Sequence, residues 1–420
     1  MPPVPDPTRP PPDGARLARI QRRFGEFATE YAALPLYSTI CRHVALDAET
    51  ASLLLAARPG QARPVLWLAA LHDLLLRNPD LPAAQWYPSV SGASSASAAD
   101  PWPDVRRTAL GHADELRHLI ATHGTQTNEV NRAVYVAVGL AAATADCSAV
   151  PVALVELGAS AGLLLGVDRY AVELTSPGGT DHLGDVASTV RCSGEDRTGV
   201  GARLTAAGAG LPAVRGRVGL DLDPVDLTSV DEVRWLEACL WPEVPGRVER
   251  FRAACGLLRG DPPTVLRGDM VDHLAHTVRF ARTRAGHDAH VVVLSSWAMT
   301  YLAPARRLEL AATLDALAGD VSRLSWLTAE PQGCVPGLQE PTVDVEGDTV
   351  LGLQRWRDGR ALAPPFSGPA TRTAPGSTPH PRCPTCDPRV IHAPALLLGG
   401  RGRSAGHRFR HPLTAARPAP

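Results

Sequence analysis

Apolar side chains recur at helical spacing through the first third of the chain, from Ala15 to about Thr144. Residues 106–123 show this pattern well, because their apolar positions share one helix face: Leu110, Ala113, Leu116, Leu119 and Ile120. Residues 63–76 are apolar on most sides and predict a buried helix, whereas the Ser- and Ala-rich residues 90–100 predict a loop. We therefore expect an all-helical N-terminal region over residues 15–149.

The pattern changes near Val150. Residues 152–157 read Val-Ala-Leu-Val-Glu-Leu, which is typical of a buried strand in a parallel sheet. Gly158–Gly162 predict a tight turn and Leu163–Tyr170 the start of a helix, so the segment opens a βαβ unit. Residues 173–211 are polar and too long for a plain crossover, which predicts a β-rich insertion with hairpins.

Strand and helix patterns alternate through the rest of the central region. The predicted strands cover residues 214–222, 264–266 and 290–294, and the predicted helices cover 231–239, 247–258 and 304–318. Such alternation is typical of a doubly wound α/β sheet. We expect a Rossmann-like α/β domain over residues 150–364, following the helical region.

Both ends of the chain lack periodicity. Residues 1–14 are rich in Pro, and residues 365–420 form a Pro- and Arg-rich tail. From residue 371 onward the tail holds eight Arg and one acidic residue, Asp387, although the whole chain has a formal net charge of −1. Because such composition buries little apolar surface, we expect both segments to be disordered.

Composition sets limits on the function. With 420 residues, 45% of them hydrophobic and 20% charged, the chain is typical of a globular protein. Every one of its 42 basic residues is Arg, which excludes a lysine Schiff base or P-loop lysine. The near-zero net charge gives no nucleic-acid signal. No apolar run approaches the roughly 20 residues that a membrane-spanning helix needs, and the N-terminus lacks the apolar region of a signal peptide. We therefore expect a cytoplasmic protein without a membrane partner.

The main chemical signal is Val155-Glu-Leu-Gly-Ala-Ser-Ala-Gly162. An acid at a strand end, followed by glycines at a strand-to-helix turn, is a pattern that nucleotide-type cofactors require. The G-x-x-x-G spacing is that of the first motif of class I methyltransferases, which bind S-adenosylmethionine. Glu156, Gly158, Ser160 and Gly162 are therefore candidate cofactor-binding residues. The alternative is a tight turn without a ligand.

The same stretch also matches G-x-S-x-G, the nucleophile elbow of α/β hydrolases, with Ser160 as nucleophile. That mechanism requires a histidine late in the chain. The candidates all lie in the tail: His380, His392, His407 and His411.

Three acids near predicted strand ends are further cofactor candidates. Asp221 or Asp223 would accept the ribose hydroxyls, and Asp269 would reach the adenine edge. Each has a structural alternative, because a turn acid or helix cap places the same residue type at the same position.

Ser295 ends the fourth predicted strand, where the substrate of such a sheet would lie. No general base is evident. Tyr301 and His72 are weak catalytic candidates, and both are also explained as packing residues. Cys383-Pro-Thr-Cys386 is a lone C-x-x-C in the tail, so we expect no metal site.

Taken together, these segments resemble a bacterial, mostly actinobacterial, family of unknown function with a class I methyltransferase-like core. The resemblance covers roughly residues 15–360 and rests on several stretches: Leu34-Pro-Leu-Tyr37, Trp86-Tyr-Pro-Ser89, Gln126-Thr-Asn-Glu-Val130, Val155 to Tyr170, Val218 to Pro224 and Val265 to Asp269. The chain departs from the family at Gly162-Leu-Leu-Leu165, where the family has Asn, at Ser295-Ser296, and in its C-terminal tail.

The resemblance implies an α/β core and suggests S-adenosylmethionine as cofactor, but it supplies no substrate. We expect a methyltransferase acting on an unknown small-molecule acceptor. The alternatives are a hydrolase with Ser160 as nucleophile, or a non-catalytic ligand-binding relative of the methyltransferase fold.

Overall fold

A computed structural model describes residues 13–92, 99–196, 199–338, 349–362 and 390–391. The chain forms two compact units: Met1–Asn128 with Val230–Val248, and Glu129–Ser229 with Glu249–Pro420. The predicted boundary near residue 149 falls after helix α8 (Ala133–Thr144), which the structure assigns to the second unit. The expectation of disorder over 1–14 and 365–420 concerns residues that mostly lie outside the described part, although residues 13 and 14 begin helix α1.

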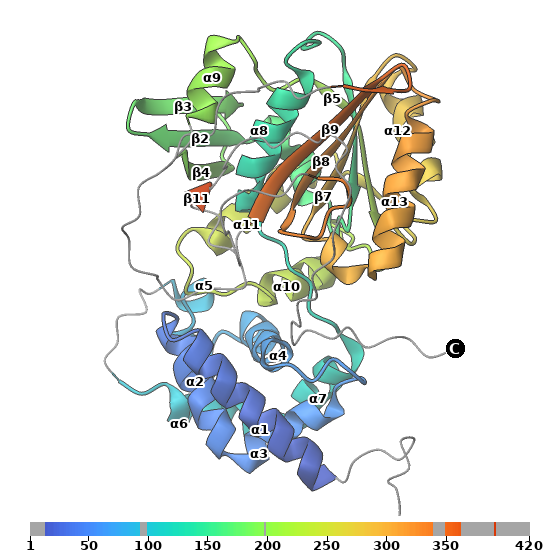
Figure 1. Cartoon of the computed structure of the whole chain (residues 1–420). Helices are drawn as coiled ribbons and strands as arrows, with labels where there is room; N and C mark the ends of the chain where they lie inside the picture. Colours follow the sequence, from blue (N-terminus) through green and yellow to red (C-terminus); the bar gives the residue numbers. More distant parts are fainter. Residues whose placement is uncertain (1–12, 93–98, 197–198, 339–348, 363–389, 392–420) are drawn as a thin grey trace, which may run out of the picture. The chain divides into compact units, whose positions relative to one another are not determined.

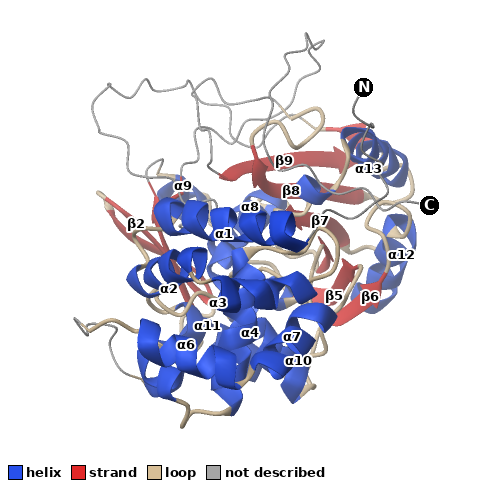
Figure 2. Cartoon of the chain, turned by 90° about the horizontal axis from the view of Figure 1, so that it is seen from below, coloured by secondary structure: helices blue, strands red, loops and turns tan. Residues whose placement is uncertain are grey.

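The described residues of the first unit are helices and loops only, as Figure 2 shows by colour. Its helices are α1 (Asp13–Glu30), α2 (Pro35–Leu46), α3 (Ala48–Ser52), η1 (Leu53–Ala56), α4 (Pro64–Arg77), η2 (Pro82–Trp86), α5 (Pro88–Ser91), α6 (Trp102–Gly111), α7 (Ala113–Thr122) and α10 (Val230–Ala238). The single helix expected over residues 106–123 is wrong. The chain breaks at His112, where φ is −119° and ψ is 31°. Gly111 favours this break, since glycine is a poor helix former.

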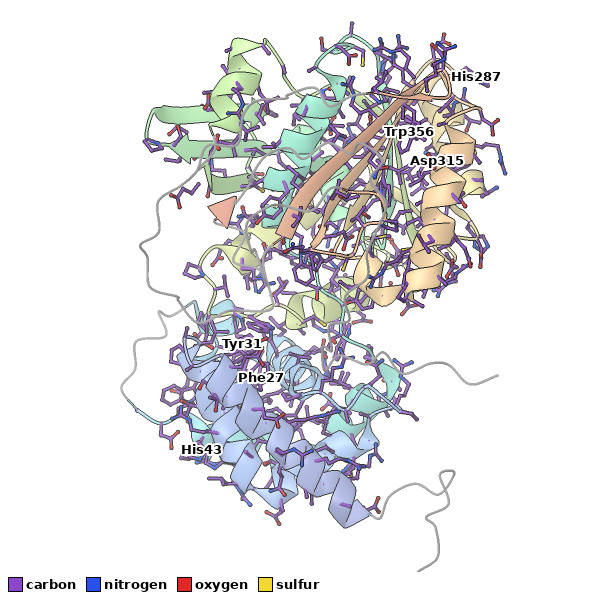
Figure 3. All side chains as sticks on the ribbon, viewed as in Figure 1. Phe27, Tyr31, His43, His287, Asp315 and Trp356 are labelled. Carbon is purple, nitrogen blue, oxygen red and sulfur yellow. The ribbon has the colours of Figure 1, made fainter. Side chains whose placement is uncertain are left out.

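An aromatic cluster holds the later segment of this unit against its first helices. The ring of Trp241 lies 5.8 Å from Phe27 of α1 and 4.7 Å from Tyr31, the residue that follows α1, centroid to centroid (Figure 3). The Glu243 carboxylate accepts hydrogen bonds from the backbone N–H groups of Leu36 (2.6 Å) and Tyr37 (2.9 Å). These amides belong to the first turn of α2 and have no partner within the helix, so the carboxylate satisfies them.

The second unit contains a seven-stranded sheet with the order β10-β9-β8-β7-β1-β5-β6. Its strands are β1 (Val152–Leu157), β5 (Val214–Asp221), β6 (Thr264–Arg267), β7 (His290–Ser296), β8 (Arg323–Pro331), β9 (Thr349–Arg357) and β10 (Arg360–Ala361). The five strands from β6 to β8 are parallel, whereas β9 and β10 are antiparallel. The expected α/β fold with a mostly parallel sheet is confirmed.

Helices cover both faces of this sheet (Figure 1). Helix α8 packs against β7, β8 and β9 and is buried along its whole length. On the opposite face, α12 (Leu274–Ala285) and α13 (Pro304–Leu317) pack against alternate apolar residues of the strands, such as Val155, Val293 and Trp326. The Trp356 indole of β9 donates a hydrogen bond of 3.2 Å to Asp315 of α13 (Figure 3).

The insertion expected over residues 173–211 supplies most of a second, smaller sheet with the order β11-β4-β2-β3, and β11 comes from the segment that was expected to be disordered. The sheet consists of β2 (Ala171–Ser176), β3 (Gly179–Gly184), β4 (Arg191–Asp196) and β11 (Val390–Ile391), and helix α9 (Val200–Ala206) follows β4. The helix predicted over Leu163–Tyr170 is a short 3₁₀ helix, η4 (Leu163–Arg169). Helix α11 (Arg247–Leu258) spans the division between the units. In the described part of the chain, no helix is both long and apolar enough to cross a bilayer.

The packing of α8 on the sheet gives a first prediction. A Cβ at Gly139 would overlap with the buried Leu327 side chain of β8. Gly139→Ala should therefore lower the free energy of unfolding by about 1–3 kcal/mol through overpacking. Gly256→Ala in α11 is the matched control, because its Cβ meets open space and should be neutral or stabilising by up to about 1 kcal/mol. Chemical denaturation checks both values, and equal effects would contradict the packing of α8.

Candidate functional site

The order of strands reverses at β1. From β1 the chain continues to its neighbour β5 and then to β6, and it later returns to β7 on the other side of β1 and continues to β8. In an open α/β sheet, the loops at the carboxyl ends diverge at such a point and leave a crevice in which ligands bind. A candidate site therefore lies at the carboxyl ends of β1, β5, β7 and β8.

The loop after β1 folds over the end of β5. Gly158 and Gly162 both have φ of 71°, and Ser160 has φ of 52°, so the turn uses the left-handed region three times. The N–H of Gly158 donates to the carbonyl of Leu220 (2.8 Å), and the N–H of Ser160 donates to Oδ2 of Asp221 (2.7 Å). A Cβ on Gly219 of β5 would lie 2.6 Å from Cβ of Ala159, so this close approach requires glycine.

The three predicted cofactor-binding acids have structural partners. Oδ1 of Asp221 accepts a hydrogen bond from the N–H of Asp223 (2.8 Å), so Asp221 holds two turns at once. Asp223 is exposed and forms an ion pair with Arg267 at 3.1 Å. Asp221 can still accept further hydrogen bonds, because an ionised carboxylate has about four acceptor positions.

Asp269 lies in the turn after β6. Its carboxylate accepts hydrogen bonds from the N–H groups of Val271 (2.8 Å) and Asp272 (3.1 Å), and it pairs with Arg306 at 2.7 Å. Partial burial opposes the charged form, but these hydrogen bonds and the Arg306 charge outweigh it and lower the pKa of Asp269. These are the contacts of a turn acid, which is the structural alternative for this residue.

The loop after β7 is held by Glu330, a residue that the sequence analysis missed. Trp297 has φ of 56°, and the N–H groups of Ala298 (3.0 Å) and Met299 (3.2 Å) donate to Oε1 of Glu330 at the end of β8. Glu330 is fully buried. Burial raises its pKa to about 7, although the two backbone N–H groups and the Arg132 charge act in the opposite direction.

Glu156 and Arg132 form the other charged part of this region. Glu156, at the end of β1, is 4% exposed, and its Oε2 has no hydrogen-bond partner. Burial, and secondarily the negative charge of Asp221, raises the pKa of Glu156, while the charge of Arg132 opposes this. Arg132 comes from η3 (Val130–Arg132), donates to the carbonyl of Ser296 (3.3 Å) and lies 5.9 Å from the centre of the Trp297 ring.

Buried polar atoms without a hydrogen-bond partner are concentrated here. Six of the thirteen such side-chain atoms in the described residues belong to this region: Nε of Arg132, Oε2 of Glu156, Oγ of Ser295, Oγ of Ser296, Oγ1 of Thr328 and Oε2 of Glu330. The Ser295 hydroxyl makes no hydrogen bond of good geometry, yet it lies close enough to Glu330 to lower the pKa of that carboxyl. Buried polar groups in folded proteins are almost always satisfied, so this cluster indicates a ligand or ordered water.

Neither of the two weak catalytic candidates contributes an atom to this cluster. Tyr301 follows β7 in η5 (Met299–Tyr301) and is 75% exposed. His72 belongs to the first unit and is fully buried, and both its ring nitrogens make hydrogen bonds, to Ala238 and Ser89. The distal histidines proposed for the hydrolase and the Cys383–Cys386 pair lie outside the described residues.

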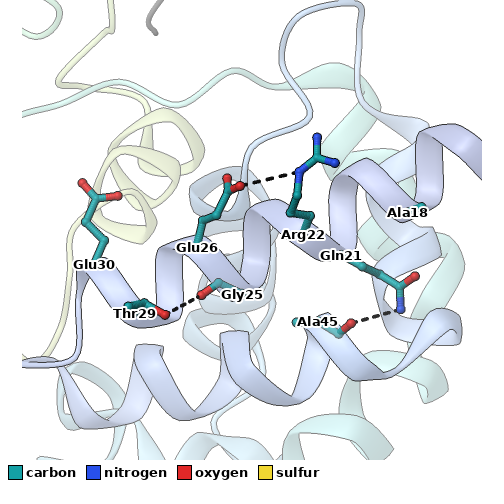
Figure 4. Close-up of a pocket in the computed structure, with 8 residues that line it drawn as sticks. All are labelled: Ala18, Gln21, Arg22, Gly25, Glu26, Thr29, Glu30 and Ala45. Carbon is teal, nitrogen blue, oxygen red and sulfur yellow. Dashed lines mark hydrogen bonds and ion pairs between the residues drawn. The ribbon is translucent and has the colours of Figure 1, made fainter. Parts of the chain in front are cut away.

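Other features of the described residues offer less chemistry. No group of three or more His, Cys, Asp or Glu residues in the described ranges could hold a metal ion. An open groove of about 830 Å³ lies along α1 and is lined by residues such as Arg22, Glu26 and Ala45 (Figure 4). Arg22 pairs with Glu26 at 3.6 Å, and the groove contributes none of the buried side-chain atoms that lack a hydrogen-bond partner among the residues that the structure describes.

Comparison with known proteins identifies a family. Residues 21–366 match a family described as "Uncharacterized protein conserved in bacteria (DUF2332)". The match covers more than half of the chain, so the chain belongs to this family, and the expected bacterial family of unknown function is confirmed. No curated protein and no solved structure matches the chain.

The burial of Glu330 predicts a pH dependence of stability. Its pKa of about 7 in the folded protein exceeds the ordinary value of 4.5, so between these pH values the folded chain keeps a proton that the unfolded chain has lost. Stability must therefore fall as the pH rises through this window, by on the order of 1–3 kcal/mol. Glu330→Gln keeps an oxygen that accepts the hydrogen bonds of Ala298 and Met299 but cannot ionise. This substitution should therefore remove the fall in stability that Glu330 causes as the pH rises.

Denaturant unfolding of both proteins at pH 5, 6, 7 and 8 measures the effect. The stability of Glu330→Gln relative to the wild type should increase across this range. The control is Glu26→Gln on α1, whose exposed side chain pairs with Arg22, and this variant should keep the wild-type profile. Parallel profiles for the wild type and Glu330→Gln would show that Glu330 is ionised throughout.

Proposed function

We propose that this member of the family binds S-adenosylmethionine at the carboxyl ends of β1, β5 and β7 and transfers its methyl group to a small acceptor. The observation that carries the proposal is the buried Glu156 carboxyl. Its Oε2 lacks a partner and it lies next to a glycine turn, at the point where the strand order reverses. The reversal also supports a Rossmann-like core, because nucleotide-type ligands bind at such points.

The residues present suit an amino-acid ligand with an ammonium group. Without a ligand, burial and Asp221 disfavour the charge on Glu156. A cation at Oε2 would reverse this balance, because an opposite charge within a few ångströms favours the carboxylate. Glu156 is therefore assigned to the ammonium of the methionine part, and Gly158, Ser160 and Gly162 to the shape of the turn beside it.

The predicted ribose and adenine contacts have unequal support. Asp221 lies at the end of β5 and keeps acceptor capacity beyond its bonds to the Ser160 and Asp223 amides. We retain it as the ribose-binding residue. Asp223 is committed to Arg267 and Asp269 to Arg306, so either would have to exchange an ion pair for a ligand contact.

When bound, S-adenosylmethionine supplies a methyl group on a sulfonium, which needs neither a metal nor a nucleophilic residue of the protein. The chain's task is to position the acceptor and to receive its proton. Glu330 is the strongest candidate for that proton acceptor, because a base with a pKa near 7 suits neutral pH and its Oε2 has no partner. Ser295 belongs to β7, which lies between β1 and β8, and we assign it to the part of the site that binds the methyl acceptor.

One observation favours the hydrolase alternative. Ser160 has φ of 52° although it is not glycine, and a nucleophile elbow holds its serine in a similarly strained turn. The labelling experiment at the end of the next subsection distinguishes this alternative, because it identifies the serine that reacts.

The first test is calorimetric titration of the full chain with S-adenosylhomocysteine. The wild type should bind, and Glu156→Gln should bind about 10–100-fold more weakly, since a charge-assisted hydrogen bond contributes about 1.5–3 kcal/mol. The control is Glu26→Gln in α1, whose exposed carboxyl pairs with Arg22, and this variant should bind as the wild type does. Absence of binding by the wild type at millimolar ligand would reject the methyltransferase proposal.

The second test uses the glycine turn. Gly158 and Gly208 have similar φ values, 71° and 65°, so alanine costs both sites a similar strain of about 1–2 kcal/mol. At Gly158 the new Cβ would also lie 3.1 Å from Ala298 in the loop after β7, whereas at Gly208 it meets open space. Gly158→Ala should therefore weaken S-adenosylhomocysteine binding at least about 10-fold, a loss of about 1.4 kcal/mol or more, and Gly208→Ala should not. Equal affinities would place the ligand away from the β1 turn.

A further inference from the structure

The helical unit contains a serine–histidine pair that the proposed methyl transfer does not use. Oγ of Ser89, in the short helix α5, lies 2.7 Å from Nε2 of His72 in α4. Nδ1 of the same ring lies 3.1 Å from the carbonyl oxygen of Ala238 in α10. All three residues belong to one compact unit.

The carbonyl contact fixes the proton positions on the ring. A backbone carbonyl oxygen only accepts hydrogen bonds, so Nδ1 must carry the proton that it donates to Ala238. In the neutral imidazole, Nε2 then has a lone pair and accepts the hydroxyl proton of Ser89. A hydroxyl, a base that accepts its proton and a third group that orients the base are the three parts of an activated serine nucleophile.

The surroundings suit acyl transfer. His72 is fully buried, while Ser89 is only partly buried, so the base is shielded and the nucleophile is the more accessible of the two. The ring of Tyr87 lies 5.2 Å from the imidazole, and its hydroxyl is buried without a hydrogen-bond partner.

We propose that Ser89 and His72 form a nucleophile–base pair that hydrolyses small carboxylic esters. Oγ of Ser89 bonds to the ester carbonyl carbon as its proton passes to Nε2 of His72. The bond from that carbon to the leaving alcohol oxygen then breaks, and the alcohol takes the proton from Nε2. Water next attacks the acyl carbon, its proton returns through Nε2 to Ser89, and the carboxylic acid leaves. This activity is independent of the methyltransferase proposal.

The test is covalent labelling of the full chain with an alkyl fluorophosphonate, followed by peptide mapping. The wild type should carry one adduct, on Ser89, and Ser89→Ala should carry none. Ser91→Ala is the matched control: Ser91 lies in the same helix and its hydroxyl donates to the carbonyl of Tyr87, so labelling of Ser89 should persist. His72→Gln should slow labelling by about 100-fold or more, as expected for loss of a general base.

Circular dichroism of each variant separates loss of reactivity from loss of fold, and mapping of the wild type needs no variant. Release of nitrophenol from p-nitrophenyl acetate should depend on Ser89 in the same way. An unlabelled wild type, or labelling that persists in Ser89→Ala, would overturn the proposal. An adduct on Ser160 would also overturn it and would favour the α/β-hydrolase alternative. S-adenosylhomocysteine binding is a separate measurement, so each proposal can fail alone.

Discussion

Several polar groups are buried without hydrogen-bond partners at the carboxyl ends of β1, β7 and β8, and their cost limits what this part of the fold can be. Each such group costs about 1–3 kcal/mol, against a total stability of about 5–15 kcal/mol for a typical domain. Glu156, Ser295 and Glu330 all contribute to this cluster. A fold can carry several of these costs together only where a ligand or ordered water completes the hydrogen bonds. We therefore expect a ligand to bind at the carboxyl ends of these strands.

Two side-chain carboxyl groups, one at the end of β5 and one at the end of β8, hold the loops that follow β1 and β7. Asp221 of β5 accepts the amide of Ser160 in the loop after β1, and Glu330 of β8 accepts two amides in the loop after β7. Each loop contains a non-glycine residue with positive φ, Ser160 or Trp297, which costs about 1–2 kcal/mol. A hydrogen bond contributes about 0.5–1.5 kcal/mol, or about 1.5–3 kcal/mol where the acceptor is ionised, and these bonds offset the strain. Both loops thus combine a residue of positive φ with backbone N–H groups that donate to a carboxyl group on another strand.

The sequence predicts what depends on local pattern and misses what depends on tertiary contact. The apolar runs of β1, β5, β6 and β7 identify these strands, and the length of residues 173–211 indicates the insertion. Strands β8 and β9 escape prediction because Ser325, Thr328 and Gly352 interrupt their apolar pattern. The role of Glu330 is not local either, since its partners lie about 30 residues earlier in the chain. The acid after the apolar segment 324–329 is the one signal that could have indicated it.

A crystal structure of the full chain with S-adenosylhomocysteine tests the central claim most directly. We expect ligand density at the carboxyl ends of β1 and β7, with the ligand's ammonium group in hydrogen-bond contact with Oε2 of Glu156. Several of the buried polar atoms that lack a hydrogen-bond partner at these strand ends should gain one from the ligand or from ordered water. Ligand bound elsewhere on the chain, with Glu156 still without a partner, would contradict the account.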